Sequence, residues 1–361
     1  MPPWRLGAID FLSPRVGVAL TAAQIPCTLS RGQGIGFPPQ QVRLAVSRDG
    51  GRQWITRGQV IAESGRGFGL EQVAAASTRR VWALTTSGHL LETRDGGGTW
   101  TPQPLPAPVV DLAQAGATLW ALACPRRAPA WCRPVLERLA SPQAAWQRLP
   151  VPPLRAGYYR LLDAVSARAA VFLVSRNGLA QAELASTSDA GQHWAVRTAP
   201  RGPRVTRGHG HLCDIYAGIT NAGPKRWWLV CNGSGAGGSS PKVLMVTTNA
   251  GRSWRTIATV RSILATPKPG SLPWQEVLTM AAGSASRLWL ATSNEMMQST
   301  DGGARWARIR VANPQGSPTS FDVFSSRRAW LLAAGEGLWG TSNGTEWHRI
   351  GATWPDPALT P

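Results

Sequence analysis

Short apolar segments alternate with turn-forming residues along the whole chain, and this pattern predicts β-strands. The segments VAAASTRRVWAL (73–84), DLAQAGATLWAL (111–122), TMAAGSASRLWLAT (279–292) and FDVFSSRRAWLLAA (321–334) share one layout. Each has an apolar strand, a small turn, and a second strand that places Trp among aliphatic residues. We find no sustained helical period and no apolar run long enough to span a membrane. The pattern therefore predicts an all-β protein.

A short sequence motif recurs after these segments and divides the chain into units. Clear copies are SRDGGRQW (47–54), TRDGGGTW (93–100), TSDAGQHW (187–194), TTNAGRSW (247–254) and STDGGARW (299–306). A shortened copy is TSNGTEW (341–347), and SPQAAW (141–146) keeps little besides the Trp. The Trp residues that end the motifs stand at 54, 100, 146, 194, 254, 306 and 347, with separations of 46, 46, 48, 60, 52 and 41.

Seven units of similar length, each with four predicted antiparallel strands, indicate a seven-bladed β-propeller. We expect a single domain over 1–361. Its approximate blades are 5–60, 61–105, 106–150, 151–200, 201–260, 261–312 and 313–354.

Tryptophan placement supports the propeller prediction. Of the 18 Trp residues, seven follow the repeated turns. Six more fall on predicted second strands, where large rings fill the wedge between blades: Trp82, Trp120, Trp227, Trp228, Trp289 and Trp330. Trp131 and Trp274 fall in loops and are better candidates for exposed contacts.

The motif Ser/Thr-x-Asp-x-Gly-x-x-Trp resembles the Asp box, or BNR repeat. With AIDFLSPRVGVAL and LLETRDGGGTW, the wider unit is similar to the photosystem II assembly-factor (YCF-type) propellers and their bacterial relatives, within the sialidase-like superfamily. The resemblance covers nearly the whole chain. It implies a non-catalytic assembly or interaction platform, although sialidases, sorting receptors and some cellulose-degrading enzymes also carry Asp boxes.

The repeated turns are predicted to be scaffold rather than sites. The Asp side chain accepts backbone N–H bonds within its own turn, and the Gly takes a positive φ. Asn replaces Asp in two copies, and a site that needed a carboxylate would not tolerate this swap. One carboxylate per turn is also too few ligands for calcium. The structural residues are Asp49, Asp95, Asp189, Asn249, Asp301 and Asn343.

The charge balance is strongly basic, at 38 Lys and Arg against 19 Asp and Glu, for a formal net charge of +19. In the usual propeller geometry the first-to-second and third-to-fourth turns share one face. Basic residues on the predicted first-to-second turns are Arg15, Arg79, Arg80, Arg168, Lys225, Arg226, Arg287, Arg327 and Arg328. The repeated turns add Arg48, Arg52, Arg94, Arg252 and Arg305. We expect a basic face. The residues on it serve either as solvated side chains stacked on neighbouring rings or as a docking surface for an anionic partner.

Acidic residues also follow the repeat, with one on or beside each first strand: Asp10, Glu71, Asp111, Asp163, Asp214, Glu276 and Asp322. We expect them near the central channel, towards the face opposite the repeated turns. Two interpretations stay open. Each carboxylate either bonds to backbone groups of the next blade, or the set forms an acidic mouth for a cation.

The long links between blades are the best ligand-site candidates, because that opposite face usually holds the ligand. Together with the loop Trp131, they offer Arg155, Tyr158, Tyr159, Arg160, Arg204, Arg207, His209, His211 and Trp274. His209 and His211 with Cys213 match no standard zinc motif. We therefore predict no metal and no cofactor.

Four of the five cysteines form two plausible disulfide pairs, Cys124 with Cys132 and Cys213 with Cys231. Such bridges favour an exported, periplasmic or envelope setting. Cys27 is left over, and the first residues lack a signal peptide. The chain is then either cytosolic or begins after a removed leader.

Three functions follow. The first is a monomeric protein-interaction or assembly platform, with a protein or an anionic polymer or surface as partner, and a carbohydrate ligand also stays open. The second is a glycoside hydrolase acting through Glu71, Glu276 and Asp214. A sialidase fits poorly, because an Arg-Ile-Pro motif is missing, only three Tyr exist, and sialidases have six blades. The third is nucleic-acid binding, which is supported by the net charge alone and is the weakest of the three hypotheses.

Overall fold

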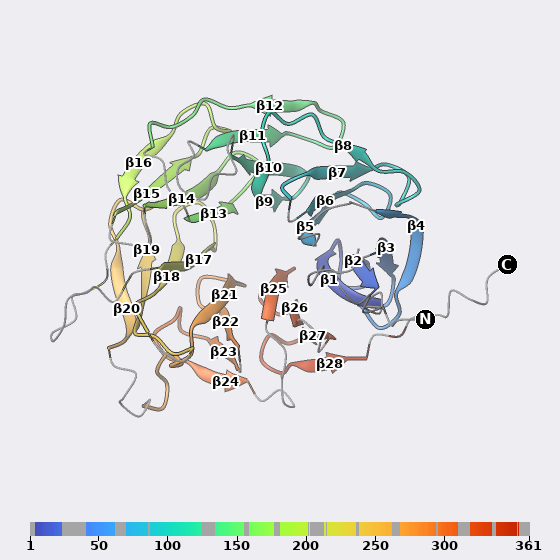
Figure 1. Cartoon of the computed structure of the whole chain (residues 1–361). Helices are drawn as coiled ribbons and strands as arrows, with labels where there is room; N and C mark the ends of the chain where they lie inside the picture. Colours follow the sequence, from blue (N-terminus) through green and yellow to red (C-terminus); the bar gives the residue numbers. More distant parts are fainter. Residues whose placement is uncertain are drawn as a thin grey trace, which may run out of the picture.

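The computed structural model is a ring of seven four-stranded antiparallel sheets, a seven-bladed β-propeller (Figure 1). It describes residues 4–23, 41–61, 70–85, 87–124, 134–154, 159–176, 181–200, 202, 213, 215–235, 238–261, 268–293, 295–309, 318–333, 337–351 and 353. The predicted fold class is confirmed. Within the described residues no helix forms, and thus none long and apolar enough to cross a membrane.

Each blade is built from four consecutive strands, in the order of the chain from the ring centre outwards. The first three blades contain β1 (Trp4–Phe11), β2 (Gly17–Ala23), β3 (Gln41–Ser47), β4 (Ile55–Ile61), β5 (Leu70–Ala75), β6 (Val81–Thr85), β7 (Leu90–Thr93), β8 (Thr101–Pro102), β9 (Val109–Ala115), β10 (Thr118–Ala123), β11 (Val135–Leu139) and β12 (Trp146–Arg148).

The fourth and fifth blades contain β13 (Tyr159–Ala164), β14 (Ala170–Arg176), β15 (Gln181–Thr187), β16 (Ala195–Thr198), β17 (Ile215–Asn221), β18 (Trp227–Asn232), β19 (Lys242–Thr247) and β20 (Arg255–Val260). The last two contain β21 (Val277–Ala282), β22 (Leu288–Thr292), β23 (Met296–Ser299), β24 (Ala307–Ile309), β25 (Pro318–Val323), β26 (Ala329–Ala333), β27 (Gly337–Thr341) and β28 (His348–Ile350).

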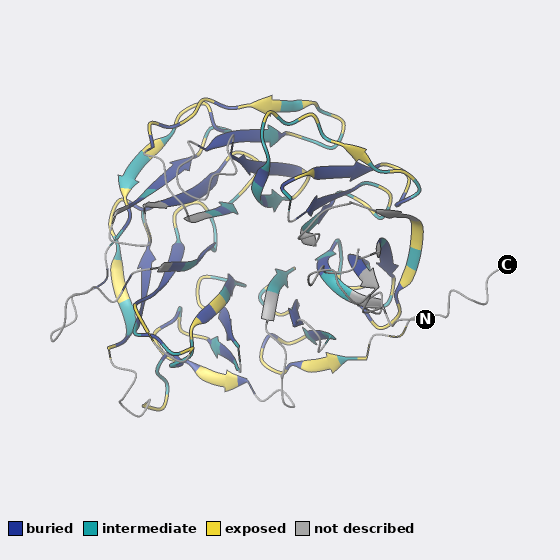
Figure 2. Cartoon of the chain, viewed as in Figure 1, coloured by how far each residue is buried: buried dark blue, intermediate teal, exposed yellow. Residues whose placement is uncertain are grey.

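Burial falls from the middle of each blade outwards (Figure 2). Second strands such as β6, β10, β22 and β26 are buried at every residue, because both of their faces pack against a neighbouring blade. Outer strands are mostly exposed, as in β12 and β28. The core is therefore a ring of apolar seams between blades, which explains the near-continuous apolar second strands in the sequence.

Second-strand tryptophans fill these seams, as the sequence predicts. Trp82, Trp120, Trp228, Trp289 and Trp330 are fully buried. Three of them also donate an indole N–H to the turn of the next blade: Trp228 to Gly302 (2.9 Å), Trp289 to Gly344 (3.3 Å) and Trp330 to Gly50 (3.3 Å). These rings connect blades by hydrogen bonds as well as by packing.

The ring closes between the seventh and first blades. Phe11 stacks on Trp330 with the ring centroids 3.7 Å apart, and Asp322 accepts a hydrogen bond from the backbone N–H of Phe11. Beyond β28, Thr353 pairs with the first blade, since its N–H donates to Arg52 O (2.8 Å) and its carbonyl accepts from Trp54 N (3.1 Å). The last described residue thus bridges the two ends of the ring.

Candidate functional site: the turn face and its central cavity

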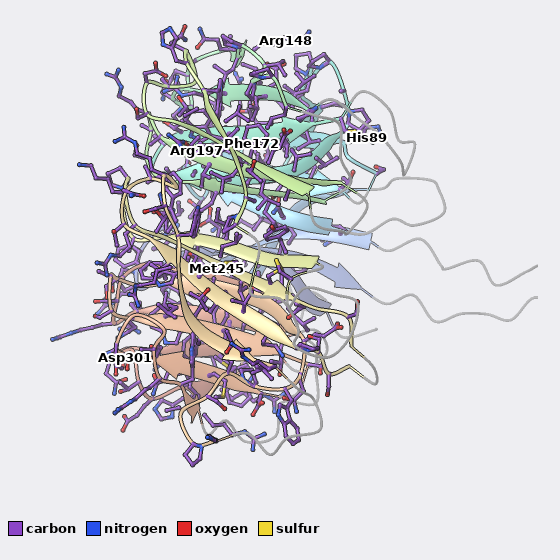
Figure 3. All side chains as sticks on the ribbon, turned by 90° about the vertical axis from the view of Figure 1, so that its left-hand side faces the viewer. His89, Arg148, Phe172, Arg197, Met245 and Asp301 are labelled. Atoms are coloured by element: carbon purple, nitrogen blue, oxygen red, sulfur yellow. A yellow bond between two sulfur atoms is a disulfide. The ribbon has the colours of Figure 1, made fainter. Side chains whose placement is uncertain are left out.

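Two kinds of turn form one face of the ring, which we name the turn face. Outer turns join the third and fourth strands of a blade, and inner turns join the first and second. Backbone bonds tie them together: Gly50 N donates to Arg15 O (2.8 Å), Gly96 N to Arg79 O (2.9 Å), and Ala190 N to Arg168 O (2.7 Å). In the edge-on view Asp301, on an outer turn, and His89, in a second-to-third-strand loop, lie on opposite sides of the ring (Figure 3).

The outer turns share one hydrogen-bond pattern. In the second blade Asp95 accepts bonds from Thr99 N (2.9 Å) and from the Thr93 hydroxyl (2.8 Å), while Gly97 N donates to Thr93 Oγ1 (2.8 Å). Asn249 accepts the equivalent bonds from Ser253 N (2.9 Å) and Thr247 Oγ1 (2.9 Å). An amide can therefore replace the carboxylate without loss of the turn.

Backbone geometry explains the glycines of these turns. The residue after the acid has positive φ in every well-formed copy, at 81° for Gly96 and 75° for Gly302. Ala190 and Ala250 keep this conformation at 66° and 58°, although side chains disfavour it. The turns are structurally constrained scaffold.

The hydrogen bonds hold the turn carboxylates in their charged form. The bonds from the Thr99 backbone and the Thr93 and Thr99 hydroxyls lower the pKa of Asp95 to about 2. Bonds from the His193 backbone and ring lower the pKa of Asp189. Although some burial opposes them, similar bonds lower the pKa of Asp49 and Asp301.

Basic side chains project from both kinds of turn, and they divide into two groups. Some have structural partners. Arg80 pairs with the buried carboxylate of Glu92 (2.6 Å) and lies over Trp82, Arg226 donates to Ala285 O (3.2 Å) in the next blade, and Arg287 donates to Gly344 O (2.5 Å). Arg94 also pairs with Glu92 (3.2 Å). Arg328 is half-buried.

The second group is exposed, and we name it the basic rim. Its members are Arg15, Arg48, Arg52, Arg79, Arg168, Lys225, Arg252, Arg305 and Arg327. They come from the first, second, fourth, fifth, sixth and seventh blades. The first group has structural partners, and the basic rim is exposed to solvent.

A cavity of about 800 Å³ lies at the centre of this face. Inner-turn residues line its mouth, including Leu12, Ala76, Gly116 and Phe324, and first strands form its wall. Three of the predicted channel acids, Asp10, Asp163 and Asp322, line it as well. Each is the penultimate residue of its strand, so these acids lie beside the turn face. This corrects the expectation that they lie towards the opposite face.

The channel carboxylates connect neighbouring blades. Asp10 accepts a bond from Ala75 N (2.6 Å), Asp111 from Leu162 N (2.8 Å), and Asp163 from Asn221 Nδ2 (2.7 Å). Asp322 accepts from Phe11 N, as described above. Asp111 also accepts from Gln72 Nε2 (2.8 Å) and is not among the cavity-lining residues.

Burial raises the pKa of three of these channel carboxylates, whereas hydrogen bonds lower the pKa of the turn carboxylates. It raises the pKa of Asp10 to about 6, against a smaller opposing effect of the Ala75 bond. It also raises the pKa of Asp163 to about 6, with the Asn221 bond opposing and Asp111 adding to the rise. For Asp322, burial and the nearby charge of Asp10 raise the pKa well above its ordinary value.

The remaining predicted acids are placed differently. Glu276 lies just before β21 and is exposed. Asp214 and the side chain of Glu71 lie outside the described residues. Of the three hydrolase candidates only the side chain of Glu276 is described, so their grouping stays a prediction.

Most of the predicted link site also falls outside the described residues: Trp131, Arg155, Tyr158, Arg204, Arg207, His209, His211 and the side chains of Tyr159 and Arg160. Trp274 is described and half-buried, and its carbonyl accepts bonds from Ser240 N (3.0 Å) and from the buried Lys242 Nζ (2.8 Å). Burial lowers the pKa of Lys242 to about 8, against the charges of Glu276 and Glu295. Trp274 anchors the link and lines a second cavity of about 440 Å³.

The cysteines are partly described. A disulfide joins Cys213 and Cys231, with their Cα atoms 5.0 Å apart. Cys124 is disulfide-bonded as well, while its expected partner Cys132 and also Cys27 lie outside the described residues. In the described part of the chain no group of three or more His, Cys, Asp or Glu side chains is arranged to hold a metal ion.

Comparisons with known proteins identify fold relatives. No protein-family model matches the chain, and neither does any curated protein. Among solved structures it is similar to YCF48 bound to a D1 peptide, with a TM-score of 0.50 and 16% identity over 79% of this chain and 81% of that one. An ancestral GH74 enzyme matches with a TM-score of 0.59 and 11% identity, over 97% of this chain and 48% of the enzyme.

A structure from a study of two prolyl endopeptidases matches with a TM-score of 0.53 and 12% identity, over 96% of this chain and 48% of that one. At these identities the likeness shows a shared propeller fold. It is common to enzymes and to a protein seen bound to a peptide, so function must be argued from the site itself.

Proposed function

We propose that the protein is a non-catalytic interaction platform whose turn face binds an acidic protein partner. The observation that carries the proposal is the division of the basic residues. Nine of them stay exposed on one face around the ring, after structural partners have been assigned to Arg80, Arg94, Arg226 and Arg287. A ring of exposed positive charges attracts an anionic partner to the face that carries it.

A peptide-bound propeller of the same fold supports a protein partner rather than a polymer. The four described channel aspartates each accept a hydrogen bond from the next blade, which supports a role in joining the blades rather than in glycoside hydrolysis.

Binding of a fluorescein-labelled poly-glutamate to the intact protein tests the proposal. We expect the triple variant Arg79→Glu, Arg168→Glu and Arg327→Glu to weaken binding by at least about tenfold at low salt. The matched control reverses Arg57, Arg148 and Arg255, which are exposed on outer strands. Equal weakening by both variants would refute a role for the turn face.

Two further probes separate the alternatives. Anionic vesicles and duplex DNA should bind more weakly than poly-glutamate at equal salt, and tighter binding of DNA with a steep salt dependence would favour the nucleic-acid hypothesis. Turnover of fluorogenic glycosides, lost on substitution of Glu71, Glu276 or Asp214, would favour the glycoside hydrolase.

We also propose that the protein functions in an oxidising compartment, either the cell envelope or outside the cell. The disulfide between Cys213 and Cys231 supports this setting, because structural disulfides persist where thiols are not kept reduced. Mass spectrometry of the natively expressed protein, alkylated without reductant, should recover the two cysteines as one linked peptide. Recovery of both as alkylated thiols would contradict the proposal.

A further inference from the structure

The central cavity has the opposite charge from the rim around it. Asp10, Asp163 and Asp322 line it, and none of its described lining residues is Arg or Lys. The whole protein carries a net charge of +19. A partner that covers the turn face therefore meets positive charge at the rim and negative charge at the centre.

Apolar surface lines the same cavity. Phe324 is 48% exposed, one of few large apolar side chains exposed to this degree among the described residues. Phe321, Ile219 and Met280 line the wall with it. A small inorganic cation makes no use of such surface, whereas the alkyl stem of a long side chain packs against it.

The carboxylates retain capacity for a ligand. The Asp163 bond to Asn221 and the Asp10 bond to Ala75 each use Oδ2, and Asp322 likewise bonds through Oδ2. Each group lines the cavity and has a second oxygen. Burial opposes the charged form of these groups, and a cation placed beside them favours it.

We propose that the cavity seats one lysine side chain of the acidic partner segment. Its stem would lie against Phe324 and its ammonium group would approach Asp10 and Asp322, which neighbour each other across the seam between the first and last blades, while flanking acidic residues contact the basic rim. This inference rests on the proposed function and adds a sequence requirement to it. The partner segment carries a central lysine between acidic residues.

Two peptides of equal length test the lysine directly. One is fluorescein-labelled Asp-Glu-Gly-Lys-Gly-Asp-Glu, and the other has norleucine in place of Lys. Norleucine keeps the stem but makes the peptide one charge more negative, so the rim alone would bind it more tightly. We expect the lysine peptide to bind at least about tenfold more tightly at pH 7.5.

The possible outcomes separate the two proposals. Equal or tighter binding of the norleucine peptide overturns the lysine site and leaves the acidic platform standing. Binding of neither peptide, together with failure of poly-glutamate, overturns both proposals. Free cadaverine that binds as tightly as the lysine peptide would overturn the assignment to a partner's side chain in favour of a small amine.

Two cavity variants give distinct signatures. Phe324→Ala changes an exposed side chain, so we expect the fold to be kept and both peptides to weaken equally, since they share the stem. Asp10→Asn should reduce the preference for lysine and should not weaken binding of the norleucine peptide. A lysine preference that is unchanged in Asp10→Asn, with thermal unfolding unchanged, would contradict the assigned contacts.

Discussion

The aspartates of the outer turns and those of the channel are the same residue in two settings with opposite outcomes. Both accept hydrogen bonds from N–H groups, as Asp95 does from Thr99 and Asp10 from Ala75. At the exposed turn the bonds dominate and the pKa of Asp95 falls to about 2, while in the channel burial dominates and the pKa of Asp10 rises to about 6.

This difference separates aspartates with a structural role from aspartates that are candidates for ligand binding. The side chain of a turn aspartate accepts hydrogen bonds from its own turn, and Asn can take its place. A channel aspartate has a charge that its surroundings satisfy incompletely, and it lines a cavity. A strongly shifted pKa with desolvation as its cause is the more informative sign of a binding site.

The largest effect is expected at the ring closure. Asp322→Ala leaves the Phe11 N–H without its acceptor in the seam between the last and first blades, which costs about 1–3 kcal/mol. Asp322→Asn keeps an acceptor and removes the repulsion by Asp10, so it should be clearly more stable than the Ala variant at pH 8. Urea unfolding of both variants measures this, and equal destabilisation would show that the carboxylate itself is required.

A smaller effect is expected in the pH dependence of stability. Asp10 and Asp163 have raised pKa values, so their contribution is complete below about pH 4 and is lost as the pH rises through about 6. The turn aspartates have lowered values, so their contribution is present above about pH 4 and is lost as the pH falls towards about 2.

Melting temperatures measured from pH 2 to 8 should therefore be highest between about pH 4 and 5. In the double variant Asp10→Asn and Asp163→Asn, the fall in melting temperature from pH 5 to 7 should be smaller. The fall in melting temperature below about pH 4 should be unchanged. A decline from pH 5 to 7 that is unchanged in the double variant would assign it to other groups.

The smallest effect is expected at a turn. Asp95→Asn should change the melting temperature little at pH 7, because Asn249 and Asn343 already occupy equivalent positions in the native ring. Asp95→Ala should lower it measurably, since the bonds from Thr93 and Thr99 are lost. If the Asn variant is as unstable as the Ala variant, charge rather than hydrogen bonding holds the turn.

The sequence was sufficient for the fold because the fold depends on periodicity. The spacing of Trp54, Trp100 and their equivalents counts the blades, and the apolar second strands locate the seams. It was also sufficient to place Asp10, Asp111, Asp163 and Asp322 on first strands. These features depend on where a residue falls within the repeated unit, and a single sequence is enough to show this.

The contacts between blades could not be predicted in the same way. Arg226 and Arg287 look like rim residues in the sequence but bond to carbonyls of the next blade. The acceptors, Ala285 and Gly344, are about 60 residues away, and no local pattern marks them. The predicted position of Asp10, Asp163 and Asp322 along the channel was wrong although the signal was local, since each stands one residue before the end of its strand and therefore close to the inner turn.

The division between turn and channel aspartates is tested most directly by a carboxyl titration by NMR with aspartate labelled at Cγ with ¹³C, assigned by single Asp→Asn variants. We expect one group of resonances that titrates near pH 6, from Asp10 and Asp163, and a second group that includes Asp95 near pH 2. Addition of the lysine peptide should lower the pH at which Asp10 titrates and leave Asp95 unchanged. Titration of both groups near pH 4, with no response to the peptide, would contradict the division between scaffold turns and a binding cavity.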